Sequence, residues 1–357
     1  MTSKNNNSVI FTTQLASDVN ALLQGVSSEQ LFILTDTQTQ QHCLPLLQSE
    51  GMLQHAKIYT MPAGDHYKTI ETVVDIWKFL GENGGTRHSV LINLGGGVVT
   101  DLGGFIANTF KRGIRFINVP TTLLSMVDAA VGGKTGINFN GLKNEVGVIN
   151  PAETVVICSD FLRSLDTHNL LSGYAEMLKH GLLSSRQEMK RLSSFDATKP
   201  DYALLASLIE TSVQIKANIV EQDPTEKGIR KALNLGHTIG HAFESYSHAT
   251  NRPILHGYAV AWGLIGELFL SHKVQGFPQD VLLQTVRFIK DNYGVFDITC
   301  NDYPALYEYM AHDKKNAIAG QVNFTLLKDV GNIVPNCIVE KELIFQALDF
   351  YRDSVGL

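Results

Sequence analysis

Histidines at helical spacing are the first side chains in this sequence with metal-binding chemistry. His237 and His241 stand four residues apart in the stretch KALNLGHTIGHAFE, and His256 follows in a loop-like LHG step. At about 100° per residue, Arg230 and Asn234 fall on the same stripe of a predicted helix as the two histidines. The residues beside this stripe are largely apolar, so the helix is expected to be buried. Buried polar side chains need partners, and two imidazoles at this spacing can point at one metal ion.

A carboxylate and an ammonium group stand together in a second stretch, GYAEMLKHG. Glu176 and Lys179 are three residues apart, which places them on one face of a short predicted helix. With two histidines, Glu176 would complete a His₂Glu set, which binds zinc or a similar divalent ion and leaves one position open for water or substrate. Spacing alone does not choose whether His237 or His241 joins His256 in that set. Histidines at this spacing are also common as core residues with satisfied hydrogen bonds, and the carboxylate is what favours a metal site.

Glycines mark positions where another backbone or a ligand is expected to come close. Gly236 and Gly240 stand beside the histidines although glycine is a poor helix former, and a close approach would explain them. Three glycines at 95–97 join a strand to a helix, and backbone amides in such a turn can face a pyrophosphate. Their spacing is not GxGxxG, so the turn favours phosphate binding without indicating one cofactor. Lys134 in VGGKTGIN matches a P-loop only in the letters GKT, but its glycine neighbours leave it well placed to contact an anion.

Apolar, strand-like runs alternate with helical segments through the first half of the chain. This alternation predicts a Rossmann-like α/β domain over residues 1–160, with helices on both faces of a parallel sheet. Ligands of such sheets bind at the carboxyl ends of strands, where Asp36 and Lys68 follow strands, although Asp36 could equally cap a helix. The segment NFNGLKNEVG is predicted to be a loop. Helical periods then dominate, so residues 161–357 are predicted to form a mainly helical metal- and substrate-binding domain, with a short hairpin over QVNFTLLK and NIVPNCIV.

Composition limits the classes of partner. The 357 residues carry a formal net charge of -6, with 18% charged residues, which gives no general attraction to nucleic acid or anionic membranes. Four cysteines without a CxxC pair predict neither a disulfide framework nor a thiolate zinc site, and they fit a reducing cytoplasm. The longest apolar run, AVAWGLIGELFL, is too short to span a bilayer, and the first residues lack the apolar core of a signal peptide. A cytoplasmic protein that binds anions through a local cluster of cations is therefore expected.

Taken together, these motifs resemble the 3-dehydroquinate synthase family of the shikimate pathway, which leads to chorismate and the aromatic amino acids. The resemblance runs from about Asp36 to Lys315 and rests on GGGVVTDLGGF, KRGIRFINVPTTLLSMVDAAVGGKTGIN, LKN, SGYAEMLKHG, RKALNLGHTIGHAFE, LHGYAVAWG and MAHDKKN. It implies an NAD-binding α/β domain, a helical metal domain and a homodimer. The implied reaction converts 3-deoxy-D-arabino-heptulosonate 7-phosphate to 3-dehydroquinate and phosphate. The implied steps are transient oxidation by NAD, phosphate elimination, re-reduction and intramolecular aldol closure.

The resemblance also implies roles for individual residues, carried over motif by motif. Zn²⁺ or Co²⁺ would be bound by Glu176, His237 and His256, so that His241, one turn further on, faces the substrate. NAD would be bound by Asp36, Asp65, Lys68, Gly96, Gly97, Val98, Asp101, Thr121, Thr122, Asp128, Lys134, Lys143, Phe161 and Ser164. The substrate would contact Lys134, Asn144, Lys179, Lys216, Arg230, Asn234, His241 and Lys314, with Arg112 reaching across from the second subunit.

The chain departs from the family pattern in three places. Asp65 and Asn169 stand where the family commonly has glutamate, and the loop after Asn144 differs from the usual one.

Three other functions fit parts of the pattern. A 2-deoxy-scyllo-inosose synthase, which acts on glucose 6-phosphate, belongs to the same superfamily. The cations predicted to bind the substrate favour one that carries a carboxylate. A metal-dependent polyol dehydrogenase would release NADH to solvent. A binding protein without activity is disfavoured, because no metal-ligand or cationic position is lost.

Overall fold

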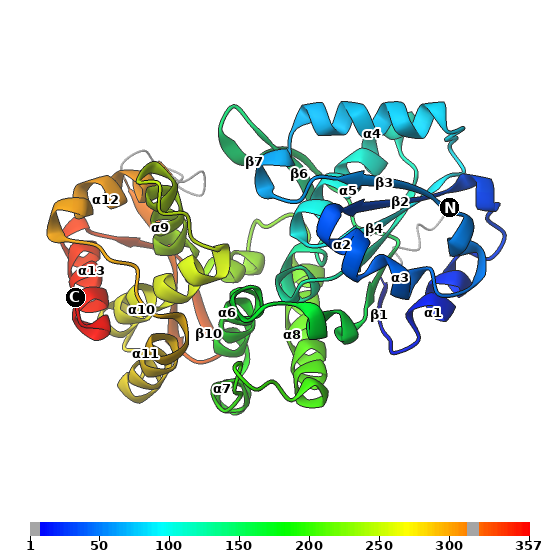
Figure 1. The fold of residues 1–357 in the computed structure, drawn as a ribbon. Helices are drawn as coiled ribbons and strands as arrows, with labels where there is room; N and C mark the ends of the chain where they lie inside the picture. Colours follow the sequence, from blue (N-terminus) through cyan, green and yellow to red (C-terminus); the bar gives the residue numbers. More distant parts are fainter. Residues whose placement is uncertain (1–7, 313–320) are drawn as a thin grey trace. The chain divides into compact units, whose positions relative to one another are not determined.

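The computed structural model describes residues 8–312 and 321–357 (Figure 1). Contacts between Cα atoms divide them into two compact units. Unit 1 holds the described residues up to Asp166 together with Tyr202–Val213, and unit 2 holds Thr167–Asp201 together with the described residues from Gln214 onward. The division into residues 1–160 and 161–357 stays a prediction of the sequence.

Unit 1 is built on a six-stranded sheet in which every pair of neighbouring strands is parallel. The order is β1-β8-β5-β4-β2-β3, with β1 at Ser8–Phe11, β2 at Leu31–Asp36, β3 at Lys57–Met61, β4 at Val90–Gly95, β5 at Arg115–Pro120 and β8 at Thr154–Ile157. Every residue of β4 and β8 is buried. Strands covered on both faces read as continuous apolar runs, which is why the sequence indicated a parallel sheet. The predicted α/β architecture is confirmed.

Helices cover this sheet within unit 1. They are α1 (Leu15–Leu22), α2 (Thr37–His42), α3 (Leu44–Leu47), α4 (Ile70–Glu82) and α5 (Gly97–Thr109). In Figure 1, α4 lies on one side of the strands and α1 to α3 lie on the other. After β5, a π-helical turn covers Ser125–Ala129. The prediction that NFNGLKNEVG is a loop is wrong. The segment holds the end of the first strand, the turn and most of the second strand of a hairpin, β6 (Lys134–Phe139) with β7 (Leu142–Ile149).

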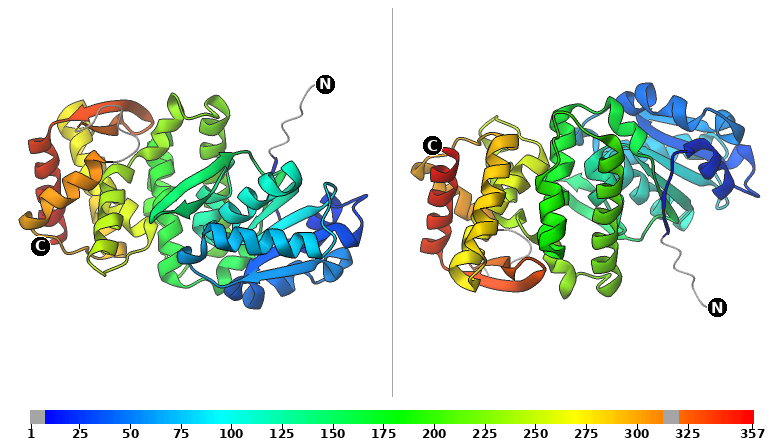
Figure 2. Two further views of the ribbon diagram at one scale, coloured as in Figure 1. Left: turned by 90° about the horizontal axis from the view of Figure 1, so that it is seen from above. Right: turned by 90° about the horizontal axis from the view of Figure 1, so that it is seen from below.

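Unit 2 is mainly helical, as predicted. Its helices are α6 (Thr167–Ser184), α7 (Arg186–Ser193), α9 (His237–Ala249), α10 (His256–Gln275), α11 (Gln279–Tyr293), α12 (Tyr303–Ala311) and α13 (Lys341–Val355). Of these, α6 has the largest share of buried residues, and α13 packs against α10 and α11 (Figure 2). The predicted hairpin is confirmed, with β9 (Val322–Asp329) antiparallel to β10 (Asn332–Val339).

One further helix, α8 (Tyr202–Gln222), contributes its first part to unit 1 and the rest to unit 2. Within residues 8–312 and 321–357 it is the one helix that is long and apolar enough to cross a membrane by length and composition. Core helices of soluble proteins pass the same test. Leu205, Leu208 and Ile209 of α8 are buried in the protein, as a core helix requires.

Candidate functional site

The stretch from Arg230 to His241 does not form one continuous helix. A 3₁₀ segment covers Ile229–Asn234, and α9 begins only at His237. Between them, Gly236 adopts a left-handed conformation with φ of 80° and donates its N–H to the Glu267 carboxylate at 2.6 Å. The prediction of a single helical stripe is therefore wrong at this point, because a side chain distant in sequence holds the backbone in a turn. His256, predicted to lie in a loop-like step, is instead the first residue of α10.

Glu176 of α6 lies beside two imidazoles that come from different helices. Its Oε1 is 3.2 Å from His237 Nε2 and 3.5 Å from His256 Nε2. The side chain is 0% exposed, and Lys179 forms an ion pair with it. Neither carboxylate oxygen makes a hydrogen bond of good geometry to any described residue. A fully buried carboxylate facing two imidazole nitrogens is one of the donor sets that hold a tetrahedral zinc or cobalt ion with a fourth position open, so the residues fit such an ion.

A third imidazole, His241, lies in the same cluster. Its ring centre is 5.3 Å from that of His237 and 5.7 Å from that of His256. One nitrogen from each of the three rings lies within 4.8 Å of the others. Proximity alone does not separate His241 from His237 and His256. His237 as a ligand and His241 as the substrate-facing residue remain predictions.

In His237 and His256, the second ring nitrogen, Nδ1, makes a hydrogen bond that fixes the orientation of the ring. His237 Nδ1 donates to the Leu235 carbonyl oxygen at 3.0 Å, and His256 Nδ1 donates to Glu244 Oε2 at 3.0 Å. Both bonds leave Nε2 as the nitrogen that faces Glu176, as in metal sites where a partner orients the ligand. The sequence analysis missed Glu244. Its position seven residues after His237, on the same face of α9, is the signal that could have found it.

These buried charges shift one another's pKa. Burial would raise the pKa of Glu176, but Lys179 and His237 outweigh it and hold that pKa well below its usual range. Burial, with the charge of Lys179, lowers the pKa of His237 despite the opposing effect of Glu176, which favours the neutral, metal-binding imidazole. Burial also opposes protonation of His256, yet Glu244 and Glu176 raise its pKa to about 10. A metal ion bound at His256 must therefore displace a proton.

Three of the cationic residues predicted to contact the substrate, Lys179, Lys216 and Arg230, are buried in unit 2, whereas Lys134 and Arg112 are exposed residues of unit 1. Lys216 is 5% exposed and Arg230 is 3% exposed. Arg230 Nη1 donates to the Pro224 carbonyl oxygen at 2.8 Å, and Asn234 Nδ2 donates to Glu226 Oε1 at 3.2 Å. The sequence analysis missed Glu226, which stands in a polar stretch that indicates only a loop. Lys314 lies outside the described residues.

Several residues predicted to contact NAD come together in unit 1. The buried Lys68 donates from Nζ to Asp101 Oδ2 at 2.6 Å, and it also bonds Asn144 Oδ1. Lys143 Nζ lies 3.7 Å from Asp65 Oδ2. Asn144 and Lys143 reach these partners because the pairing of β6 with β7 is irregular at this point, and an irregular register redirects side chains.

The other predicted NAD residues in unit 1 lie at strand ends and the turns after them. Gly96 is the N-cap of α5, which begins with Gly97 and Val98, and the Thr121 N–H donates to the Gly95 carbonyl oxygen. Asp36 caps α2 by accepting hydrogen bonds from two backbone N–H groups, which is the helix-capping role that the sequence also allowed. The remaining positions are Thr122 after β5, Asp128 in the π-helical turn, Lys134 at the start of β6, and Phe161 and Ser164 in a 3₁₀ segment.

Arg112, predicted to act across a subunit boundary, lies in an unusual turn. Lys111 and Arg112 have φ of 52° and 69°, and Gly113 follows with φ of 113°. Two successive non-glycine residues in the left-handed region are strained, and such strain is concentrated at functional positions.

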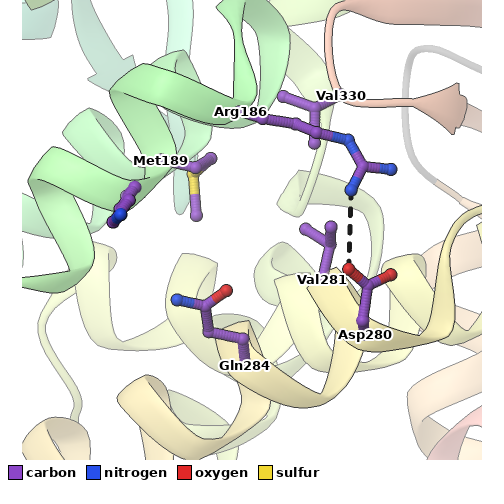
Figure 3. A pocket seen from close by; sticks show the side chains of 7 residues that line it. Arg186, Met189, Asp280, Val281, Gln284 and Val330 are labelled. Carbon is purple, nitrogen blue, oxygen red and sulfur yellow. Dashed lines mark hydrogen bonds and ion pairs between the residues drawn. The ribbon is translucent and has the colours of Figure 1, made fainter.

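A cavity of about 270 Å³ lies elsewhere in unit 2 (Figure 3). An ion pair between Arg186 and Asp280, 3.5 Å long, crosses its edge. The cavity is lined by Arg186, Met189, Lys190, Asp280, Val281, Gln284 and Val330. None of these is a predicted site residue, so the cavity carries no part of the predicted chemistry.

Known proteins match this chain in sequence over nearly its whole length. Residues 58–172 match the family model described as 3-dehydroquinate synthase N-terminal, and residues 173–316 match the one described as 3-dehydroquinate synthase C-terminal. A 3-dehydroquinate synthase of Parabacteroides distasonis is 54% identical over 349 residues, which covers 98% of this chain and 99% of that protein.

Two solved structures share the fold. A 2-deoxy-scyllo-inosose synthase complexed with carbaglucose-6-phosphate, NAD⁺ and Co²⁺ aligns with a TM-score of 0.82 at 22% identity, over 95% of each chain. A 2-epi-5-epi-valiolone synthase of Streptomyces hygroscopicus, with NAD⁺ and Zn²⁺ bound, aligns with a TM-score of 0.82 at 24% identity, over 99% of this chain and 98% of that one. At these identities the likeness shows the fold alone.

Proposed function

The chain belongs to the 3-dehydroquinate synthase family, and we propose that it converts 3-deoxy-D-arabino-heptulosonate 7-phosphate to 3-dehydroquinate and phosphate. This makes it a carbon-oxygen lyase. The observation that carries the proposal is the convergence of Glu176, His237 and His256 around one point, with a third imidazole beside them.

A divalent ion, Zn²⁺ or Co²⁺, would be held by Glu176, His237 and His256. When bound, the ion supplies a Lewis acid that makes a coordinated substrate hydroxyl more acidic. Glu176 can bind the ion as a carboxylate at neutral pH, because its pKa is held well below its usual range. Glu244 holds His256 in the orientation that turns Nε2 toward this point. We assign His241, on the next turn of α9 and with its ring 5.3 Å from that of His237, to take a proton from a substrate oxygen.

NAD would be held by unit 1, at the carboxyl ends of its strands. When bound, it supplies a hydride acceptor that later returns the hydride, so it is unchanged overall. The N-cap residue Gly96 leaves the amides of the first turn of α5 available for a pyrophosphate. Lys68, held by Asp101 and Asn144, places a cation near the same strand ends.

The substrate carries a carboxylate and a phosphate, and the chain offers buried cations for both groups. Lys179, Lys216 and Arg230 are each less than a tenth exposed. Charged donors in a site with little water bind carboxylate and phosphate strongly and in fixed positions. We assign Lys134, Asn144, Asn234 and Arg112 to the same task of holding the substrate while bonds change.

We propose a homodimer in the cytoplasm. The β6–β7 hairpin exposes four large apolar side chains, Phe139, Leu142, Val146 and Ile149, and a surface of this kind is typical of a protein interface. The four cysteines are free thiols, as in a reducing compartment. Light scattering would give the mass in solution, and a monomer at working concentration would contradict the dimer.

Phosphate release tests the activity directly. The full chain with NAD⁺ and Zn²⁺ is expected to release phosphate from 3-deoxy-D-arabino-heptulosonate 7-phosphate, to stop when a chelator is added, and to accumulate no NADH. If phosphate were released from glucose 6-phosphate and not from the heptulosonate, the fold assignment would stand, but the substrate would be that of an inosose synthase. Lasting NADH formation from a polyol would replace the lyase by a dehydrogenase.

A further inference from the structure

The two helices that carry the imidazoles meet backbone to backbone. A side chain at Gly263 of α10 would overlap the Gly236 carbonyl oxygen and come within 2.7 Å of the Gly240 backbone nitrogen. A Cβ on Gly240 would lie 2.9 Å from the Ala259 carbonyl oxygen. The expectation was that another backbone or a ligand comes close to Gly236 and Gly240, and a backbone does. Contact this close leaves α9 and α10 little freedom to shift past each other.

A buried carboxylate from α10 fixes the start of α9. The Glu267 side chain is 0% exposed. Its Oε2 accepts the Gly236 N–H at 2.6 Å, and its Oε1 accepts the N–H groups of Thr238 and Ile239 at 2.8 and 3.0 Å. Amides in the first turn of a helix have no partner within the helix, and a negative charge there is favoured by the helix dipole. One side chain therefore satisfies the amides on both sides of His237.

The two helices position each other's imidazoles. On α10, His256 is the first residue and Glu267 lies three turns later, so one rigid helix carries an imidazole and the carboxylate that fixes His237. On α9, Glu244 in turn fixes His256 through a 3.0 Å bond to Nδ1. Each helix thus contributes one imidazole and one carboxylate that orients the imidazole of the other helix.

We propose that Glu267 is a positioning residue of the metal centre. It holds the left-handed turn at Gly236, and through that turn it sets His237 relative to His256 before an ion binds. The inference rests on the proposed metal site. A helix cap with no role in the site would also be buried and hydrogen-bonded, so the test must separate metal affinity from stability.

Glu267→Gln separates these two roles. Glutamine keeps one oxygen, which can still accept from Thr238 and Ile239, but it turns an amide NH₂ toward the Gly236 N–H in place of an acceptor. The turn next to His237 loses its bond while the rest of the cap survives. Outer partners of metal ligands typically contribute about 10-fold to 100-fold in affinity. We expect the Kd for Zn²⁺ or Co²⁺ to rise by about 10-fold, with the Kd for NAD⁺ unchanged.

The full chain, stripped of metal, would be titrated with Zn²⁺ against a competing chelator, and its thermal unfolding recorded. Thr285→Ala is the matched control, because it removes a buried 2.8 Å bond within α11 of the same unit and touches neither imidazole. Weaker metal binding in Glu267→Gln, with control affinity equal to wild type, supports the proposal. Equal weakening in both variants, or a folded Glu267→Gln with wild-type affinity, overturns it.

Two further outcomes are informative. If the wild-type chain binds no divalent ion, the proposed metal site itself fails, which is distinct from a failure of Glu267. If Glu267→Gln does not fold, Glu267→Asp replaces it, since aspartate keeps the charge but draws the carboxylate back by one methylene. A folded Glu267→Asp with reduced metal affinity supports the proposal, and one with unchanged affinity overturns it.

Discussion

Replacing each of the two neighbouring histidines of α9 tests which one binds the metal. His237→Ala removes the Nε2 atom that lies 3.2 Å from Glu176 Oε1. His241→Ala removes an imidazole of the same cluster, one turn further along the same helix. Both changes replace a histidine of α9 by alanine, so each serves as the control of the other.

The size of the expected difference follows from mass action. A ligand present at 100 times its Kd stabilises the folded state by about 2.7 kcal/mol. In a domain of roughly 150 to 250 residues, each kcal/mol shifts Tm by about 2 to 4 °C. Zn²⁺ at that concentration should therefore raise the Tm of wild type and His241→Ala by roughly 5 to 11 °C. His237→Ala, which lacks one of three protein ligands, should show a shift near zero.

Thermal unfolding with and without Zn²⁺, together with the metal content after gel filtration, measures this difference. Turnover is expected to fall in both variants, because we propose that His241 transfers a proton. Equal loss of the thermal shift in both variants would refute the separation of roles. A full shift in His237→Ala would refute the ligand set itself.

Three other changes probe the supports of the site. Glu244→Ala should weaken metal binding by about 10-fold or more, because His256 loses the partner of its Nδ1; unchanged affinity in a chelator competition would contradict this role. Gly263→Ala should cost about 1 to 3 kcal/mol of unfolding free energy, since the added methyl overlaps the Gly236 carbonyl, and a denaturant titration that matches wild type would show that the helices can move apart. For Asp223, burial would raise the pKa, but three backbone N–H groups of the following loop hold it below its ordinary 3.8. A carboxyl group whose pKa is lower in the folded state stabilises the fold at pH values above its unfolded-state pKa, and this contribution is lost as the pH falls through its folded-state pKa. Asp223→Asn should therefore be less stable than wild type at neutral pH and equally stable in strong acid.

Local pattern predicted most of the sheet in unit 1. The buried runs at Leu31–Asp36, Val90–Gly95 and Arg115–Pro120 are strands because both faces are covered, and such runs stand out in the sequence. Strand β1 was missed, since it has only four residues and its partner, β8, lies about 145 positions away in the sequence. The hairpin at Lys134–Ile149 was also missed, although its Asn140–Gly141 turn is a strong hairpin signal.

In the site, the candidate metal ligands could be predicted from the sequence, but the residues that orient them could not. Glu176, His237 and His256 stand out because titratable groups are rare in apolar stretches. The turn at Gly236 could not be predicted, because the helical period continues across it and only Glu267, 31 residues later, interrupts the helix. Glu267 itself looked like a charge within an apolar run, and its three amide partners appear only in three dimensions.

The division of the chain has a consequence for synthesis on the ribosome. Unit 1 includes Tyr202–Val213, which follows a segment of unit 2, Thr167–Asp201. A nascent chain that has emerged only to Asp166 holds all six strands of the sheet but lacks the buried Leu205 and Leu208. Its apolar surface stays open until about fifty more residues have appeared, and chaperones bind surfaces of this kind. The first unit to begin folding is thus unable to finish until part of the second has been made.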